Sequence, residues 1–374
     1  MRRFITGPDY LMPTPMQPLW LLPRLFRRAL VMILLASMAP FAQASTLDDV
    51  SLPVEDRSAE ARVDALRIAL EQIMVRLTGS TSPHELPGVE AILAEPETWL
   101  AQYGYSGEGE ELRLQARFDV RAISNQLERS GAPVWGAGRP ALLLWAAPDR
   151  GDIYGRDTDA GFITALQQRA AARGLPLQLP LMDDQDRAQI SAADIRGQFD
   201  QSLQAASRRY DSPFAVTVVY YTTGQPSLRW RVLQGAAVLR EGQLSAASET
   251  ELAAALADTL ADHMAAQYAV QGSDVRLARI QVAGITRLTD WQALYEFVAS
   301  QAGVRDVALA RLAGDTAELR LDFAGSAGQL ERLLLLHARL GRCDAPIAAA
   351  RVASEPGVLL TDEGPALRLC WRQR

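Results

Sequence analysis

The sequence predicts a mixed fold, α+β and α/β, in three small modules: the middle one a three-layer α/β sandwich, the last one βαββα. Three observations lead to this prediction. Apolar residues recur with a helical period between residues 59 and 77. An uninterrupted apolar run fills residues 141–147, which is typical of a strand buried on both faces. Strand and helix patterns then alternate between residues 275 and 340.

The first module is expected over residues 45–138, as an α+β unit. Its main helix should begin at Ser58 and stop at Gly79, because glycine favours the left-handed conformation that ends helices. The other expected elements are a strand at Val50–Val54, a helix at Gly88–Ala94, a hairpin of Trp99–Tyr105 with Glu111–Asp119, and a helix over 120–130.

The middle module is expected over residues 139–270. Its apolar strand at 141–147 needs helices on both sides, so three layers with an antiparallel edge are predicted. Ser248 and Glu251 have the spacing of a capping box and should open the last helix. The other expected elements are helices at 160–173 and 192–209, a strand at Phe214–Tyr221, and a hairpin of Ser227–Gln234 with Ala236–Leu244.

The third module is expected over residues 274–374. Strands are predicted at Val275–Val282, Val304–Arg311 and Ala317–Phe323, with a further strand at Ala366–Trp371. Two capping boxes should open its helices: Thr289 with Gln292, and Ser326 with Gln329. Leu330, Leu333, Leu334, His337 and Leu340 are placed on the last helix.

Cys343 and Cys370 are the only cysteines. In an oxidising compartment such a pair is a candidate disulfide, worth about 3.5 kcal/mol on the chain-entropy model. The alternative is two free buried thiols.

Residues 1–44 have the order of an export signal. Arginines 24, 27 and 28 precede an apolar run from Ala29 to Ala39, and the small residues Ala42 and Ala44 follow. We expect cleavage between Ala44 and Ser45, which predicts a periplasmic location. A membrane anchor is the alternative, but a spanning helix needs about 20 apolar residues. Met12 or Met16 is a candidate for the true start.

The charge of the chain excludes several classes of partner. The net charge is −6, and five arginines with one aspartate give residues 1–44 a charge of +4, so the remainder carries −10. An acidic surface disfavours nucleic acid and anionic lipid, and no stable membrane insertion is expected after cleavage. All 38 basic residues are arginine, which excludes lysine-based catalysis.

The sequence offers no recognisable reactive constellation, so no catalytic residue, metal or cofactor is predicted. His84 is interpreted as a loop residue, and His263 and His337 as packed helix residues, because no H-E-x-x-H or C-x-x-C spacing accompanies them. The acidic run 183–186 lacks the glycine and glutamate of a calcium loop, so it is interpreted as a helix cap. Residues 108–111 are interpreted as a solvated hairpin tip.

Residues 133–140 form a Gly/Pro-rich connection between the first two modules. Trp135 and Arg139 lie in it, and Trp145 follows in the next strand. These three side chains are candidate binding residues, because tryptophan and arginine stack on ligands in grooves between modules. The alternative is a rigid junction, in which Trp135 is a packing anchor and Arg139 pairs with a carboxylate.

The chain resembles an uncharacterised family of exported proteobacterial proteins, domain of unknown function 2066. The resemblance is in Val75-Arg76-Leu77-Thr78-Gly79, Phe118-Asp119, Val134-Trp135-Gly136 with Arg139-Pro140, and Trp145. It implies no activity or catalytic residue. More loosely, the first module resembles N-terminal modules of periplasmic flagellar and lipoprotein accessory proteins, and the middle one resembles the N-terminal domain of the Tol-system translocation protein.

Three hypotheses on function follow. The first is a non-enzymatic accessory or scaffold protein of the periplasm, which binds an envelope protein or a peptidoglycan-associated component. The second is a hydrolase of envelope polymer that uses carboxylates whose pairing the sequence does not reveal. The third is a small-ligand-binding module. The oligomeric state is left open.

Overall fold

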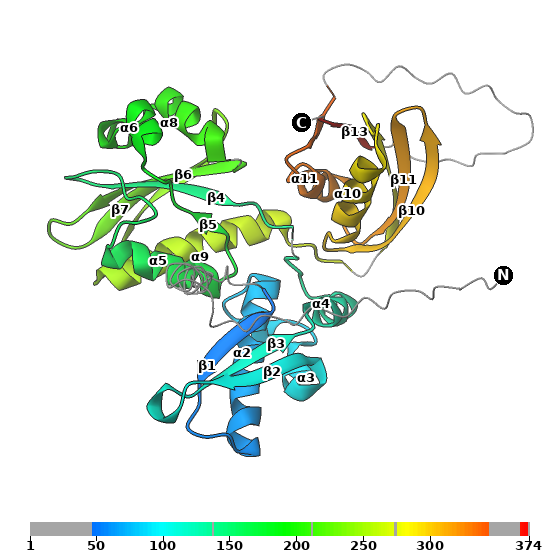
Figure 1. Ribbon diagram of the computed structural model, residues 1–374, viewed down its shortest axis with the longest axis horizontal. Coiled ribbons are helices and arrows are strands. Elements are labelled where there is room, and N and C mark those ends of the chain that lie inside the picture. The colour runs from blue at the N-terminus through cyan, green and yellow to red at the C-terminus, as the bar shows by residue number, and fades with distance from the viewer. Residues whose placement is uncertain (1–46, 137, 211, 273–274, 344–366, 373–374) are drawn as a thin grey trace, which may run out of the picture. The chain divides into compact units, whose positions relative to one another are not determined.

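The computed structural model describes residues 47–136, 138–210, 212–272, 275–343 and 367–372 (Figure 1). Helices and three β-sheets build a mixed α and β fold, which confirms the predicted fold class. The expected export signal over 1–44 and its cleavage point, Ala44 and Ser45, lie outside the described residues. Residues 45–374 form one compact unit by their contacts, so the limits proposed between the three modules stay predictions.

The N-terminal sheet has three antiparallel strands in the order β1-β3-β2. Helix α2 packs on it, capped at its start by the Ser58 hydroxyl, which accepts a hydrogen bond from the Ala61 N–H. Gly79 ends α2 in the left-handed conformation, with φ of 72°. The elements are β1 (Asp49–Pro53), α2 (Ala59–Thr78), α3 (Val89–Leu93), β2 (Leu100–Ser106), β3 (Arg113–Phe118) and α4 (Val120–Arg129), with short 3-10 helices at Pro83–Glu85, Pro96–Trp99 and Gly109–Glu111.

The middle sheet has five strands in the order β5-β4-β6-β7-β8, of which β5, β4 and β6 are parallel. Helices α5 and α9 lie on one face, and α6 and α8 on the other (Figure 1). Strand β4 is buried along its whole length, with alternate side chains in two cores, as the three-layer prediction requires. Its elements are β4 (Leu142–Pro148), α5 (Gly161–Ala172), β5 (Leu177–Gln178), α6 (Asp184–Gln189), α7 (Ala192–Gly197), α8 (Asp200–Ser207), β6 (Phe214–Tyr221), β7 (Ser227–Gln234), β8 (Ala237–Ser245) and α9 (Glu249–Tyr268).

The single helix predicted over 192–209 is wrong. The structure has α7, then α8, then a 3-10 turn at Arg208–Tyr210. Gln198 takes a left-handed backbone conformation, with φ of 60°, and this ends α7. The apolar stripe that predicted one helix is still buried, because Ile195 and Leu203 both reach the same core.

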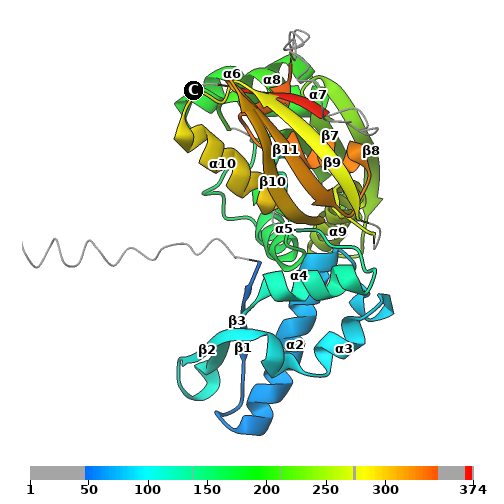
Figure 2. The same cartoon turned by 90° about the vertical axis from the view of Figure 1, so that its right-hand side faces the viewer.

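The C-terminal sheet has five strands in the order β10-β11-β9-β13-β12 (Figure 2). Strand β9 pairs antiparallel with β11 and parallel with β13. The buried face of β11 carries alternate apolar residues, and helices α10 and α11 supply the rest of the core. The elements are β9 (Arg276–Ala283), α10 (Leu288–Ala299), β10 (Val304–Ala313), β11 (Thr316–Phe323), α11 (Ala327–Leu334), β12 (Leu340–Arg342) and β13 (Leu367–Trp371).

Two predictions for this module need correction. The capping box of Thr289 with Gln292 is wrong, because Thr289 lies inside α10, which begins at Leu288 after the N-cap Arg287. The last helix ends at Leu334, so His337 lies in a turn beyond it. Its apolar neighbour Leu340 belongs instead to β12, a strand of three residues that is too short to show a sequence period.

The far edge of this sheet is closed by a covalent bond. Cys343 and Cys370 form a disulfide with their Cα atoms 5.2 Å apart, which confirms the predicted pairing. The bond joins the end of β12 to its antiparallel neighbour β13. None of the helices in the described parts of the chain combines the length and apolar composition that a membrane crossing requires.

Candidate functional site

The C-terminal end of α2 is the point where the connection over 133–140 meets the first module. The last turn of a helix leaves carbonyl oxygens without partners inside the helix. Here groups from other elements donate to them: the Trp135 N–H donates to the Leu77 carbonyl at 2.6 Å, and the Arg139 guanidinium donates to the Arg76 carbonyl at 2.6 Å. Cations also favour the negative end of the helix dipole.

The Arg139 guanidinium is surrounded by carbonyl groups. It donates to the carbonyls of Trp135, of Gly136 at 2.9 Å and of Gly174 at 2.6 Å, in addition to Arg76. Its carbon lies 4.1 Å from the centre of the Trp135 ring. Burial, and to a smaller extent the nearby Arg76 guanidinium, lower the pKa of Arg139 to about 9, so the group still carries its charge at neutral pH. The carboxylate partner that the sequence suggested is replaced by backbone dipoles.

Arg173 provides a second connection to the end of α2, in addition to that of Arg139. Its side chain is fully buried, and it donates to the Gly79 carbonyl at 2.7 Å and to Asp258 and Asp262 at 2.6 Å each. Burial raises the pKa of the Asp258 carboxyl, but hydrogen bonds from Arg169 and Arg173 outweigh it and hold that pKa below its usual value. One arginine therefore joins α5, α9 and the end of α2.

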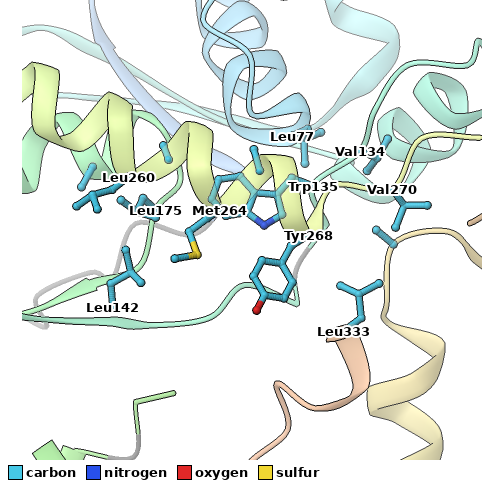
Figure 3. Close-up of a cluster of buried hydrophobic side chains, with 14 of the residues drawn as sticks. Leu77, Val134, Trp135, Leu142, Leu175, Leu260, Met264, Tyr268, Val270 and Leu333 are labelled. Atoms are coloured by element: carbon cyan, nitrogen blue, oxygen red, sulfur yellow. The ribbon is translucent and has the colours of Figure 1, made fainter. Parts of the chain in front are cut away.

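Trp135 is the packing anchor of this junction. Its side chain is fully buried among Leu77, Met264 and Tyr268 (Figure 3). Gly79 beside it has no room for a side chain, because an added Cβ would lie 2.5 Å from the Cβ of Ala265 on α9. We call Gly79, Trp135, Arg139 and Arg173, with the residues they contact, the junction cluster.

Trp145 does not belong to the junction cluster. It lies in the other core of the middle module, where its ring meets Tyr210 edge to face and its indole N–H donates to the Ser207 hydroxyl at 3.0 Å. The structure thus brings Trp135 and Arg139 together and leaves Trp145 apart. Both tryptophans are fully buried and Arg139 is partly buried, so a ligand would have to open the cores to stack on the two tryptophans.

Sequence reasoning missed Arg173. No motif surrounds it, and its partners Asp258 and Asp262 lie more than eighty residues away on another helix. The available signal was the pair of acids four residues apart on one face of α9, opposite a helix that ends in arginines.

The histidines are placed separately. His84 is half exposed between Glu90 at 2.7 Å and Glu71 at 3.0 Å, and hydrogen bonds to these two carboxylates raise its pKa. Burial, and to a smaller extent Arg240, lower the pKa of His263 on α9. His337 lies between the rings of Phe297 and Trp371. Within the described ranges, no three His, Cys, Asp or Glu side chains are grouped as a metal would need.

The acidic run 183–186 is a helix cap, as interpreted. Asp183 caps α6 by accepting from the Asp186 N–H, and Arg209 pairs with Asp183 at 2.6 Å and with Asp186 at 3.0 Å. Residues 108–111 lie between β2 and β3, at the predicted hairpin tip.

A cavity of about 820 Å³ lies between α4 and α10, next to the junction cluster. Glu128 of α4 is nearly buried there and accepts a hydrogen bond from the Gly303 N–H at 3.0 Å. The charged residues that line the cavity are Arg121, Glu128, Arg129, Glu296 and Arg305, and the uncharged polar ones are Ser124, Asn125, Tyr295, Ser300 and Gln301. Three arginines and two glutamates therefore line the cavity.

Residues 42–136 match a family described as a domain of unknown function (DUF8605). An uncharacterised domain was expected, but this is not the family 2066 that the motifs suggested, so that identification is wrong. No curated protein matches the chain. The LpoB C-terminal domain from Salmonella enterica is a similar solved structure, with 13% identity over 34% of this chain and 93% of that one. Its TM-score is 0.19, which carries no argument about fold or function.

Proposed function

We propose that this chain is a non-enzymatic accessory or scaffold protein of the periplasm that binds another envelope component, either a protein or a peptidoglycan-associated molecule. The observation that carries the proposal is the cavity between α4 and α10, whose lining holds both charged and apolar residues. Its volume is that of a pocket for a small molecule or for a few side chains of a partner.

The charge of the cavity indicates what it would receive. Arg121, Arg129 and Arg305 line it in a chain whose net charge is −6. A local excess of guanidinium groups in an acidic protein favours a partner that presents carboxylates or phosphates, since arginine forms paired hydrogen bonds with both.

Two further features support a role outside the cytoplasm. Residues 1–44 have the pattern of an export signal, and the Cys343–Cys370 disulfide belongs to an oxidising compartment. The junction cluster supports a scaffold, because its buried arginines fix α2 to the middle module and so hold the residues beside the cavity in one arrangement.

In-cell photocrosslinking tests the proposal. A photoreactive residue at Asn125, which is exposed and lines the cavity, should give one dominant adduct with an envelope component, identified by mass spectrometry. The matched control is Gln102 on β2, which is equally exposed but does not line the cavity. Arg121→Glu should weaken the Asn125 adduct. Equal adducts at both positions, or none from folded and exported protein, would contradict the proposal.

The same cavity favours a second candidate, a small-ligand-binding module. Native mass spectrometry of the protein purified from cells distinguishes the two: a retained anionic molecule, lost in Arg121→Glu, supports the ligand-binding module. The hydrolase alternative stays a prediction without a specific observation, because Glu128 of the cavity is engaged with the Gly303 N–H.

A further inference from the structure

Strand β10 is an open edge of the C-terminal sheet. Within the described ranges it pairs only with β11, and with ten residues it is longer than any other edge strand there. An edge strand presents unpaired N–H and C=O groups along its outer side, and proteins usually protect such edges with charges. The other long edge strand, β8, has Arg240 and Glu241 at its centre, whereas residues 307–310 of β10 are uncharged.

The edge also exposes apolar side chains. Leu309 faces Leu319 and Leu312 faces Ala317 across the β10–β11 pair, so both point to the core side of the sheet. Their partners on β11 are fully buried, yet Leu309 is 45% exposed and Leu312 is 58% exposed. A strand added beside β10 would cover Leu309 and Leu312.

The charged side chains of β10 indicate the chemistry of a partner strand. Asp306 faces Asp322 on the solvent side of the sheet, a pair of like charges that is unfavourable. Arg311 faces Glu318 and lies on the same side, because a bulge between Leu309 and Arg311 shifts the alternation by one residue. Among the residues that the structure describes, no ion pair is formed by Asp306 or Arg311. The strand thus carries one free charge of each sign on one face.

We propose that β10 pairs antiparallel with β10 of a second copy of this chain, around a two-fold axis at Ala308. The position of each β10 residue is counted by the β11 residue that it faces. In this register Asp306 faces Arg311 of the partner subunit, and Arg311 faces the partner's Asp306. On the core side, Val307 faces the partner's Leu309 and Val304 faces the partner's Leu312. These charged and apolar pairs are complementary, and the two-fold axis makes each of them occur twice.

The inference does not rest on the proposed function, although Val304 and Arg305 at the start of β10 also line the cavity. The test is sedimentation of the protein, purified after expression of the full chain, over a range of concentrations. The wild type should form a dimer, and Asp306→Arg or Arg311→Asp should each weaken its Kd about tenfold or more, because like charges then face each other twice. The double variant, with the charges exchanged, should recover to within about threefold of the wild type.

Arg240→Asp on β8 is the control and should leave the Kd unchanged. Recovery in the double variant excludes misfolding as the cause of the single effects. A wild type that is monomeric at every concentration, or a dimer that the two single variants do not weaken, would overturn the proposal. A double variant as weak as the single ones would overturn it as well. The crosslink from Asn125 would stand or fall separately.

Discussion

The junction cluster and the β10 edge use the same kinds of residue in opposite ways. At the junction cluster, Arg139 and Arg173 are buried or partly buried, and their guanidinium groups donate to carbonyls and carboxylates of distant elements. At the β10 edge, Arg311, Leu309 and Leu312 are exposed. The difference indicates that the junction is complete within one chain, whereas the β10 edge is left open for the second copy that we propose.

Measurements of stability test this contrast. Removing a buried side chain whose hydrogen bonds are formed lowers the free energy of unfolding strongly, whereas removing an exposed side chain changes it little. Arg173→Ala should have the largest effect. It removes a fully buried side chain, leaves the Gly79 carbonyl without its donor and empties the space between α5 and α9. We expect a loss of about 3–5 kcal/mol in the free energy of unfolding, measured with urea.

Arg156→Ala is the matched control, because Arg156 is largely exposed and its nearest carboxylate, on Asp157, lies 3.6 Å away. Its effect should stay below about 0.5 kcal/mol. Equal losses in the two variants would show that the buried arginine does not hold the junction cluster together.

The second prediction concerns the closed edge of the C-terminal sheet, opposite β10. Reduction of the Cys343–Cys370 bond, which spans 27 positions, should lower the free energy of unfolding by about 3.5 kcal/mol on the chain-entropy model. Urea unfolding with and without a reductant measures it, and a Cys343→Ser/Cys370→Ser variant should be insensitive to the reductant. An unchanged midpoint in the wild type would mean that β12 and β13 hold this edge without the bond.

The sequence predicted most of the fold, because the periodic signals were long. The stripe of α2, the apolar run of β4 and the capping box of Ser326 with Gln329 all correspond to observed elements. The predictions failed where contacts between distant elements decide where a helix begins or ends. Asp290 is held by Arg287 and by Arg339, so α10 begins at Leu288 without the predicted cap.

The candidate site was less predictable. Trp135 and Arg139 were selected because their connection is unusual in composition, and the structure places them in the junction cluster. Their burial, the separation from Trp145 and the role of Arg173 depend on contacts between elements that are far apart in sequence. The β10 edge escaped notice because its bulge at Ala310 is invisible in the sequence pattern.

The third prediction uses pH to test Asp290, a buried carboxylate of α10 whose partner Arg339 precedes β12. A hydrogen bond from Arg287 outweighs burial and, with Arg339, lowers the pKa of Asp290 to about 2 from an ordinary value of 3.8. The stabilisation is therefore complete above pH 4 and is lost as the pH falls towards 2. The advantage of wild type over Asp290→Asn in urea midpoint should shrink between pH 5 and about 2.5. A constant difference would mean that Asp290 stabilises α10 by packing rather than by charge.

The smallest effect is expected at the edge itself. Leu309 and Leu319 are the same residue type, face each other across β10 and β11, and differ in exposure, 45% against 0%. Leu319→Ser should cost about 3 kcal/mol or more, since it places a hydroxyl in the core. Leu309→Ser should change the free energy of unfolding of the monomer by less than about 1 kcal/mol, measured at a concentration where the wild type is dissociated. At higher concentration, where the dimer forms, Leu309→Ser should lose stability relative to wild type, because only there does the side chain become buried. A cost for Leu309→Ser that is large and independent of concentration would show that the edge is already covered within one chain, and the contrast with the junction cluster would fail.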